Sequence, residues 1–392
     1  MNPVRNSPPQ RPFGRASAGA ISKGVKIFYV SDARLPTEKA HGLAIMKQCE
    51  ALVRSGADVE LIVPDRRNLL KGDPFDYYRI SQRFPLIKLF TIDLIRFGRP
   101  GFLFQEFSFA LASAAYLRGK EGALYSRDEV ILWILWLCGY RDFIWESHTG
   151  GWSFAARAVA RHARHLVVIS QGLKDFYIEK GIPTSKISVL SSAIDMQDFA
   201  HPEERNAARK RLGLSDNTKI AMYIGRLDGW KGSTTLFEAA HLLPASIQVV
   251  IIGGDARDVA ALSHTYPRIF FLGYRPYSEL ADNQSAADVL VVPNTGKDEI
   301  SVRFTSPLKV IAHMASDRPI VASNLPSIRE ITGEDAALLV APDDPQALAR
   351  GIERVLADTT LADRLVLEAR HKVLAYTWLV RAEKIIALYK AA

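Results

Sequence analysis

Cysteine is scarce in this chain. Its 392 residues include only Cys49 and Cys138, which favours a reducing compartment and excludes a disulfide scaffold or a cysteine metal site. Long apolar runs are scarce as well, because the longest uncharged apolar stretches, 107–117 and 130–140, reach only 11 residues. A helix that spans a bilayer needs about 20, so we expect a cytoplasmic protein without such a helix.

Patterns that would bind a metal ion are missing from the sequence. It contains no Asp-x-Asp pair and no His/Cys cluster with zinc spacing, so we expect no metal and no other cofactor. A secretory signal is missing too. Residues 1–24 hold Arg5, Arg11 and Arg15 among Pro, Ser and Gly without an apolar core, which predicts a disordered basic tail.

The remaining composition is that of a globular protein, with 48% hydrophobic and 23% charged residues. The chain is too long for one ordinary core, so two domains of roughly 170 to 190 residues are expected. Charge is distributed unevenly: residues 1–190 carry a net charge of +10 and residues 191–392 carry −2, which together give the overall +8. A basic amino-terminal half fits anionic lipid, nucleic acid or an acidic acceptor.

Basic and apolar residues are most closely mixed between Arg79 and Arg118. Such a mixture suits a membrane surface. A core helix whose long cations reach solvent at its edge has the same pattern, and the sequence leaves both interpretations open. Nucleic-acid binding is not expected, because no recognised nucleic-acid module is present. The residues that form the pattern are Phe84, Leu86, Ile87, Leu89, Phe90, Ile92, Leu94, Ile95 and Phe97, interleaved with Arg83, Lys88, Arg96 and Arg99.

Strand and helix patterns alternate in two series. Such alternation predicts parallel sheets with helices on both faces, and 191–205, which lacks periodicity, indicates the linker between them. We therefore predict two doubly wound, Rossmann-like α/β domains, at 25–192 and 193–375, facing a central cleft. The expected strands are 25–30, 59–63, 123–125, 143–145 and 166–169, then 220–224, 249–252, 269–272, 289–292, 320–322 and 337–340; the clearest helices are 41–55, 345–357, 361–374 and 378–389.

The segment from Ala221 to Leu243, AMYIGRLDGWKGSTTLFEAAHLL, joins a buried-strand pattern to a glycine turn, two cations and an amphipathic helix. Gly225 permits a tight turn after the strand. Arg226 and Lys231 would then lie beyond the strand's carboxyl end, where open α/β sheets bind ligands and helix N-termini favour anions. The segment predicts a phosphate site, although a solvated loop that carries two cations has the same pattern.

Five motifs make the chain from Val25 onward resemble the retaining glycosyltransferases of family four, the glycosyl transferases group 1, which have the GT-B fold. The resemblance implies an acceptor-side domain at 25–192, a nucleotide-sugar domain at 193–375 and a C-terminal helix, 376–392, that returns to the first domain. The motifs are LPTEKAHGLAIMKQCEAL with His41 and Gly42, IWESHTG with His148, LVVISQGLKDFYIEKGIPTSKISVLSSAIDMQDF ahead of the interdomain crossing, IGRLDGWKG with Arg226 and Lys231, and SPLKVIAHMASDRPIVASNLPSIREI with Ser306 and Pro307.

The resemblance also implies roles for single residues. His148 would reach the donor sugar, which makes it the candidate catalytic residue, and Glu146 could orient it or contact the acceptor. The other candidates would bind the nucleotide end of the donor. They are Arg226, Lys231, Ser306, Gly42 and Lys309 at the diphosphate, and Pro307 and Ala312 in the ribose region. For Lys309, an exposed helix cation is an equally good interpretation.

One departure from the family pattern concerns its Glu-x7-Glu pair. The two positions are occupied by Phe304 and Ala312, so the carboxylate that would bind the ribose is missing. A hydrogen bond from a charged carboxylate is worth roughly 1.5 to 3 kcal/mol, and its loss could weaken donor binding on the order of ten- to a hundredfold. The alternative function is therefore a catalytically weakened binding or regulatory subunit.

The leading expectation is a glycosyltransferase that moves a sugar, with retention, from a nucleoside diphosphate sugar to a glycan or lipid-linked acceptor. The resemblance implies front-face attack, in which the departing phosphate oxygen helps to take the acceptor's proton, so a protein nucleophile is not needed. Fixed cations at Arg226 and Lys231 would stabilise the negative charge on the departing diphosphate. Peripheral contact with an anionic membrane, at its inner face, is a further expectation.

Overall fold

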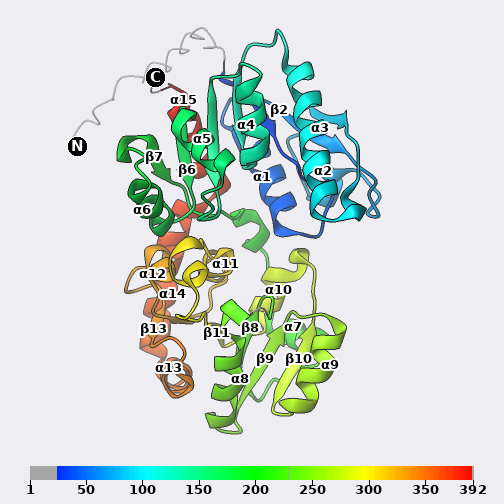
Figure 1. The fold of residues 1–392 in the computed structure, drawn as a ribbon. Coiled ribbons are helices and arrows are strands. Elements are labelled where there is room, and N and C mark those ends of the chain that lie inside the picture. Colours follow the sequence, from blue (N-terminus) through cyan, green and yellow to red (C-terminus); the bar gives the residue numbers. More distant parts are fainter. Residues whose placement is uncertain (1–23, 228, 391–392) are drawn as a thin grey trace, which may run out of the picture.

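The computed structural model describes residues 24–227 and 229–390 (Figure 1). The predicted tail, 1–24, lies outside the described residues except for Gly24. Two α/β domains are stacked, and the chain returns to the first one at its end, so that α15 (Trp378–Lys390) lies in the upper domain (Figure 1). The predicted fold of two doubly wound parallel-sheet domains is confirmed.

The N-terminal domain has a seven-stranded parallel sheet in the order β3-β2-β1-β4-β5-β6-β7. Apolar residues face both sides of the central strands, as expected for a parallel sheet that helices cover on both faces. On one face, α1 packs beside the returning α15, and on the other lie α3 to α6. The strands are β1 (Lys26–Val30), β2 (Asp58–Asp65), β3 (Leu86–Phe90), β4 (Ala123–Ser126), β5 (Phe143–Ser147), β6 (His165–Val168) and β7 (Ile187–Val189); the helices are α1 (Ala40–Arg54), α2 (Pro74–Tyr77), α3 (Arg99–Leu117), α4 (Glu129–Leu137), α5 (Phe154–His162) and α6 (Gln171–Glu179).

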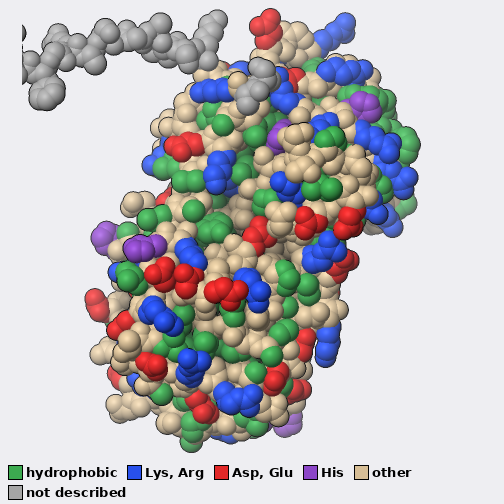
Figure 2. Space-filling model, turned by 90° about the vertical axis from the view of Figure 1, so that its left-hand side faces the viewer, with side chains coloured by type: hydrophobic (Ala, Val, Ile, Leu, Met, Phe, Trp, Pro, Cys, Tyr) green, Lys and Arg blue, Asp and Glu red, His purple; other side chains and the backbone are tan. Residues whose placement is uncertain are grey.

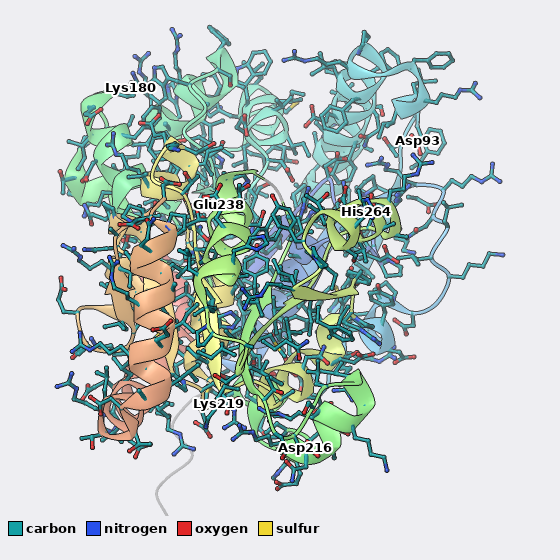
Figure 3. The ribbon with its side chains drawn as sticks, turned by 90° about the horizontal axis from the view of Figure 1, so that it is seen from below. Asp93, Lys180, Asp216, Lys219, Glu238 and His264 are labelled. Atoms are coloured by element: carbon teal, nitrogen blue, oxygen red, sulfur yellow. The ribbon has the colours of Figure 1, made fainter. Side chains whose placement is uncertain are left out.

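The C-terminal domain has a six-stranded parallel sheet in the order β10-β9-β8-β11-β12-β13. Helices α8, α9 and α13 cover one face, and α11, α12 and α14 pack on the other; Figure 3 shows α8 with Glu238 and α9 with His264 from below. The strands are β8 (Lys219–Ile224), β9 (Ile247–Ile252), β10 (Ile269–Gly273), β11 (Val289–Val292), β12 (Ile320–Ser323) and β13 (Leu338–Val340); the helices are α7 (Arg205–Leu212), α8 (Ser233–Leu242), α9 (Ala256–Thr265), α10 (Leu280–Ser285), α11 (Leu308–Met314), α12 (Pro326–Thr332), α13 (Pro345–Ala357) and α14 (Thr359–Val373).

The two crossings between the domains run side by side. Ile194 forms a parallel bridge with Thr377, its N–H donates to the Tyr376 carbonyl (3.0 Å), and the Trp378 N–H donates to the Ile194 carbonyl (3.2 Å). The start of the last helix is thereby fixed to the linker.

The predicted strands are all present, with ends shifted by at most two residues, but β3 and β7 were not predicted. The segment 79–118 is not one helix. It contains the edge strand β3, the short helix η1 (Ile95–Phe97) and α3. Many of its apolar side chains are exposed, and they form what we call the α3 surface: Phe90, Ile92, Phe97, Phe102, Leu103, Phe104, Phe107 and Leu111.

Charge is also distributed as the sequence indicates. Basic side chains predominate over the N-terminal lobe in Figure 2, whereas both signs are mixed on the C-terminal lobe. Among the described residues, no helix is long and apolar enough to cross a membrane.

Candidate functional site

The candidate site is a cleft of about 540 Å³ between the two domains. Both sheets direct strand ends toward it, as expected for ligand sites of open α/β sheets. The N-terminal domain contributes the loop before α1, the first turns of α1 and the turn after α2. The C-terminal domain contributes the turns after β8 and β9, the segment 274–281 and the first turns of α11.

The turn after β8 is built on a close approach of two glycines. The Gly225 N–H donates to the Ile252 carbonyl (2.9 Å), and a Cβ atom added at Gly253 would lie 1.9 Å from the Gly225 carbonyl oxygen. The two turns can meet only because a side chain is absent. The Tyr223 hydroxyl then donates to the Arg226 carbonyl (2.6 Å), and Arg226 lines the cleft.

Lys231 ends the short helix η4 (Gly229–Lys231), which precedes α8. Its Nζ atom lies 3.4 Å from the centre of the Trp230 ring. Gly232 follows with φ of 69°, and a Cβ atom there would lie 1.8 Å from the Pro293 carbonyl oxygen. The glycine thus lets the Lys231 loop pack against the chain beyond β11. Lys231 is not among the residues that line the cleft.

Lys309 lies in the first turn of α11 and lines the cleft. Its Nζ atom is buried, has no hydrogen-bond partner among the described residues, and lies 4.6 Å from the centre of the Tyr223 ring. Burial lowers the pKa of Lys309 well below its usual range, and the nearby Lys231 lowers it further. An anion beside this ammonium would relieve both effects.

Ser306 and Pro307 lie at the junction with the linker. The Ser192 N–H donates to Ser306 Oγ (2.8 Å), and Ser192 Oγ donates to the Ser306 carbonyl (3.0 Å). Pro307 caps α11, which begins at Leu308. The Ser306 side chain is therefore engaged with the linker, and its predicted phosphate contact stays a prediction.

Ala312 lines the cleft, and so does its neighbour His313. His313 Nδ1 lies 2.8 Å from Gln284 Nε2, and its Nε2 has no partner in the described part of the chain. Burial lowers the pKa of His313 to about 3, with a further contribution from Lys309, so the ring is neutral at physiological pH. A neutral imidazole thus lies beside Ala312, the second position of the expected Glu-x7-Glu pair.

His148 follows β5 in the N-terminal domain, and it is not among the residues that line the cleft. Its Nε2 atom lies 2.6 Å from Glu146 Oε1. Partial burial and the nearby Arg127 lower the pKa of His148, which favours a neutral ring. Its side chain retains 37% exposure, so one edge remains available for contact.

Gly42 lies in the first turn of α1, between Ala40 and Leu43, which line the cleft. A Cβ atom at Gly42 would lie 2.3 Å from the Tyr78 hydroxyl oxygen. That hydroxyl donates to the Thr37 carbonyl (2.8 Å) and accepts from the Thr37 N–H (2.6 Å). The glycine therefore permits Tyr78 to hold the loop before α1 in place.

Phe304, at the other altered family position, packs against the N-terminal domain. Its ring centre lies 5.7 Å from that of Phe176, and a Cβ atom at Gly150 would approach it to 2.8 Å. The preceding Arg303 accepts a hydrogen bond from Ser170 Oγ at its carbonyl (2.6 Å). This segment, η6 (Ile300–Phe304), therefore joins the two domains.

Sequence reasoning missed Asn294, which follows β11. Asn294 is fully buried, and neither side-chain amide atom has a partner among residues 24–227 and 229–390. The Thr295 N–H donates to the Trp230 carbonyl (3.4 Å), so Asn294 lies beside the Lys231 loop. A polar residue just beyond a buried strand was the signal that could have identified it.

No cluster of three or more potential metal ligands occurs within the described ranges. The chemistry of the cleft is instead that of cations and unsatisfied polar groups on its C-terminal side. The arrangement can bind an anion, with Arg226 and Lys309 at the wall and Lys231 nearby.

Comparison with known proteins identifies a domain. Residues 218–358 match the family described as Glycosyl transferases group 1. Over 53% of its length the chain is 28% identical to D-inositol 3-phosphate glycosyltransferase of Corynebacterium glutamicum, of which 52% is covered. The chain spans about half to three fifths of the length of the curated relatives it matches.

Solved structures extend the similarity to both domains. Sucrose-phosphate synthase of Thermosynechococcus elongatus has 22% identity and a TM-score of 0.74, with 94% of this chain and 98% of that chain covered. The HepE protein of Anabaena, in complex with UDP and glucose, has 17% identity and a TM-score of 0.73, with 94% and 100% covered. At these identities the likeness concerns the fold, and it extends over almost the whole chain.

Proposed function

We propose, from the premise that residues 218–358 are a glycosyl transferases group 1 domain within a GT-B fold, that this protein is a glycosyltransferase. Its donor would be a nucleoside diphosphate sugar bound in the interdomain cleft, and its acceptor a glycan or a lipid-linked glycan. The observation that carries the proposal is Lys309, which lines the cleft together with Arg226 and whose buried Nζ has no hydrogen-bond partner in the described chain.

The donor diphosphate fits the C-terminal side of the cleft. When the sugar leaves, negative charge builds on the phosphate, and preorganised cations stabilise that charge most where water is excluded. Arg226 and Lys309 line the cleft, and Lys231 raises the positive potential at Lys309. Asn294, with both amide atoms unsatisfied, lies beside the Lys231 loop, although it is not among the residues that line the cleft.

The sugar would extend toward the N-terminal domain. Retention follows from front-face attack, in which the acceptor hydroxyl approaches from the leaving-group side and passes its proton to the departing phosphate oxygen. No protein nucleophile takes part in this step. His148, with one exposed edge, would contact a sugar hydroxyl, and Gly42 would keep the loop before α1 close to the donor.

The α3 surface supports a lipid-linked acceptor. Its exposed apolar side chains are accompanied by exposed cations, and the Arg96 guanidinium lies 4.8 Å from the centre of the Phe97 ring. Apolar side chains that insert at the interface, together with cations near anionic headgroups, are typical of peripheral membrane binding. We propose that this surface holds the protein at the inner face of the membrane, where the acceptor would be present.

Calorimetric titration with UDP, GDP and ADP tests the proposal for the donor. The natural protein should bind one nucleotide with micromolar affinity, and Arg226→Ala/Lys231→Ala should lose most of that affinity. Lys219→Ala is the matched control, because Lys219 lies at the opposite, amino end of β8 (Figure 3). Equal affinity in all three proteins would overturn the assignment of the diphosphate site.

Two further measurements separate the alternatives. An Ala312→Glu variant restores the missing carboxylate. If only this variant binds nucleotide, the natural protein fits the alternative of a binding or regulatory subunit. Flotation with vesicles of phosphatidylcholine and phosphatidylserine tests the membrane surface. Phe97→Ser/Phe104→Ser should float less than the natural protein, and no flotation of the natural protein at low salt would refute membrane contact.

A further inference from the structure

A buried carboxylate lies directly behind His148. Glu146 is on β5, in the interior of the seven-stranded sheet, and is fully buried. Its Oε1 atom lies 2.6 Å from His148 Nε2, 3.1 Å from Arg127 Nη2 and 2.8 Å from Arg381 Nη2. The Tyr125 hydroxyl donates to the other carboxylate oxygen. Four groups therefore converge on one carboxylate.

Arg381 reaches this carboxylate from the opposite end of the chain. It lies in α15 and is only 5% exposed. Its Nε donates to the Ser191 carbonyl (3.1 Å), and its Nη1 donates to the Gln48 side chain of α1. One guanidinium thus joins the C-terminal helix, the linker, α1 and Glu146. The orientation of Glu146 depends on the docking of α15.

The charge on Glu146 determines which nitrogen of the His148 ring carries the proton. Burial alone would raise the pKa of Glu146, but Arg127 and Arg381 hold it well below its usual range, so the carboxylate is ionised. An ionised carboxylate can only accept a hydrogen bond. The neutral His148 ring must therefore carry its proton on Nε2, which leaves Nδ1 as an acceptor.

We propose that Glu146 and Arg381 are positioning residues for His148. The C-terminal helix, through Arg381, holds Glu146 in the orientation that fixes His148 as the Nε2–H tautomer, and the ring presents Nδ1 to accept a hydrogen bond from a hydroxyl of the transferred sugar. This inference rests on the proposed function, because it assumes that a sugar lies beside His148. The inference also restricts which donor sugars fit, because the sugar must have a hydroxyl that can donate a hydrogen bond to His148 Nδ1.

A purely structural role for the cluster explains less. A buried ion pair contributes little net stability compared with apolar residues of similar volume. Here Glu146 and Arg381 are buried and Arg127 is 13% exposed, so three ionised groups are largely withdrawn from water. His148 is the most exposed member of the cluster, at 37%, and all three charges act on its orientation through Glu146.

The tautomer can be measured without any substrate. In protein labelled with 15N-histidine, the ring signals of His148 are identified by their loss in His148→Ala. They should show a neutral ring protonated on Nε2 in the natural protein and in the control Lys384→Met, which removes an exposed cation from the same helix. In Arg381→Met the signals should become those of exchanging tautomers. An unchanged Nε2–H tautomer would overturn the proposal.

Glu146→Gln provides a second variant should Arg381→Met fail to fold. It keeps the shape of the side chain and removes its charge, so the amide can donate as well as accept. The fixed tautomer should be lost here too. A retained Nε2–H tautomer in this variant would also overturn the proposal, because the charge of Glu146 would then be irrelevant to the ring.

Binding and turnover distinguish this inference from the proposed function. We expect Arg381→Met to bind UDP, GDP or ADP as the natural protein does, since those contacts lie in the other domain. Turnover of UDP-glucose, GDP-mannose or ADP-glucose should fall about 10- to 100-fold at unchanged KM. In the His148→Ala background the same replacement should have no further effect. Additive losses would overturn the inference, whereas absence of nucleotide binding by the natural protein would refute the proposed function and leave the tautomer test in force.

Discussion

Replacing Lys309 by methionine should stabilise the unliganded protein and weaken its binding of a nucleoside diphosphate. The Nζ atom is buried without a hydrogen-bond partner among the described residues, and it lies 4.6 Å from the centre of the Tyr223 ring. A buried donor without a partner costs about 1 to 3 kcal/mol, and more when it is charged. Methionine keeps the length of the side chain, so the free energy of unfolding should rise by about 1 to 3 kcal/mol at pH 7.

The stability gained in Lys309→Met should decrease as pH rises. Burial and Lys231 lower the pKa of Lys309 well below that of a free lysine, so the unfolded chain binds the proton more tightly than the folded protein does. The natural protein therefore gains stability as pH rises from the lowered pKa toward about 10.4, the value for unfolded lysine. Over the same range the advantage of methionine should shrink, and above about pH 10.5 only the part that comes from the unsatisfied neutral amine should remain. Urea unfolding at a series of pH values measures it.

Lys309→Met should bind nucleotide more weakly than the natural protein, although it is more stable. A charge-assisted hydrogen bond from Lys309 to a phosphate is worth about 1.5 to 3 kcal/mol, so Lys309→Met should bind UDP, GDP or ADP roughly 10- to 150-fold more weakly. Titration in two buffers of different protonation enthalpy should show proton uptake by the natural protein and none by the variant. A variant that is less stable than the natural protein and binds nucleotide equally well would refute the assignment.

Three other replacements have defined outcomes. Asn294→Leu keeps the branched shape and removes two unsatisfied amide atoms, so urea unfolding should show a stability gain of about 1 kcal/mol or more while calorimetry shows weaker donor binding; lower stability with full affinity would contradict this. Burial, with Asp32, raises the pKa of Glu106 to about 8, so the folded protein binds this proton more tightly than the unfolded chain. Its contribution to stability is present below about pH 4.5 and lost as pH rises to about 8, and in Glu106→Gln that loss should be absent from unfolding curves at pH 5, 7 and 9. Phe304→Ala should lower the free energy of unfolding by about 2 kcal/mol, less than for a fully buried phenylalanine, and no change in thermal unfolding would show that its packing on Phe176 contributes nothing.

The fold could be predicted because its strands carry strong local signals. Central strands such as β1, β8 and β11 are nearly continuous apolar runs, and a parallel sheet buried on both faces requires that pattern. β3 and β7 lie at the two edges of the sheet and lack an uninterrupted apolar run, since β7 consists of Ile187, Ser188 and Val189. In β3, Lys88 interrupts the apolar run, and the mixture of cations and apolar residues around it was interpreted as a helical or membrane-surface pattern.

The candidate site was predictable only where its residues lie close together in the sequence. Arg226 and Lys231 follow one strand, and a single glycine turn indicates their place. In the Glu146 cluster the sequence indicates that Glu146 could orient His148, and the two side chains are in contact. Arg381 has no such signal, because it comes from the far end of the chain and also contacts Gln48, a residue 333 positions away. His313 was missed for a different reason: its ring is buried beside Gln284, and a histidine in a helix gives no indication of whether its neighbour is apolar or polar.

Phe304 and Ala312, which occupy the two positions of the expected Glu-x7-Glu pair, lie in different environments in the structure. The sequence alone treats them as two lost carboxylates. In the structure Ala312 lines the cleft, so a glutamate there would enter the space proposed for the donor. Phe304 packs against Phe176 in the other domain, and a glutamate in its place would remove an interdomain contact and bring a carboxylate against an aromatic ring, where burial disfavours its charge. Restoring affinity is therefore a meaningful test only at Ala312, and a failure of Phe304→Glu would report on domain packing rather than on the donor.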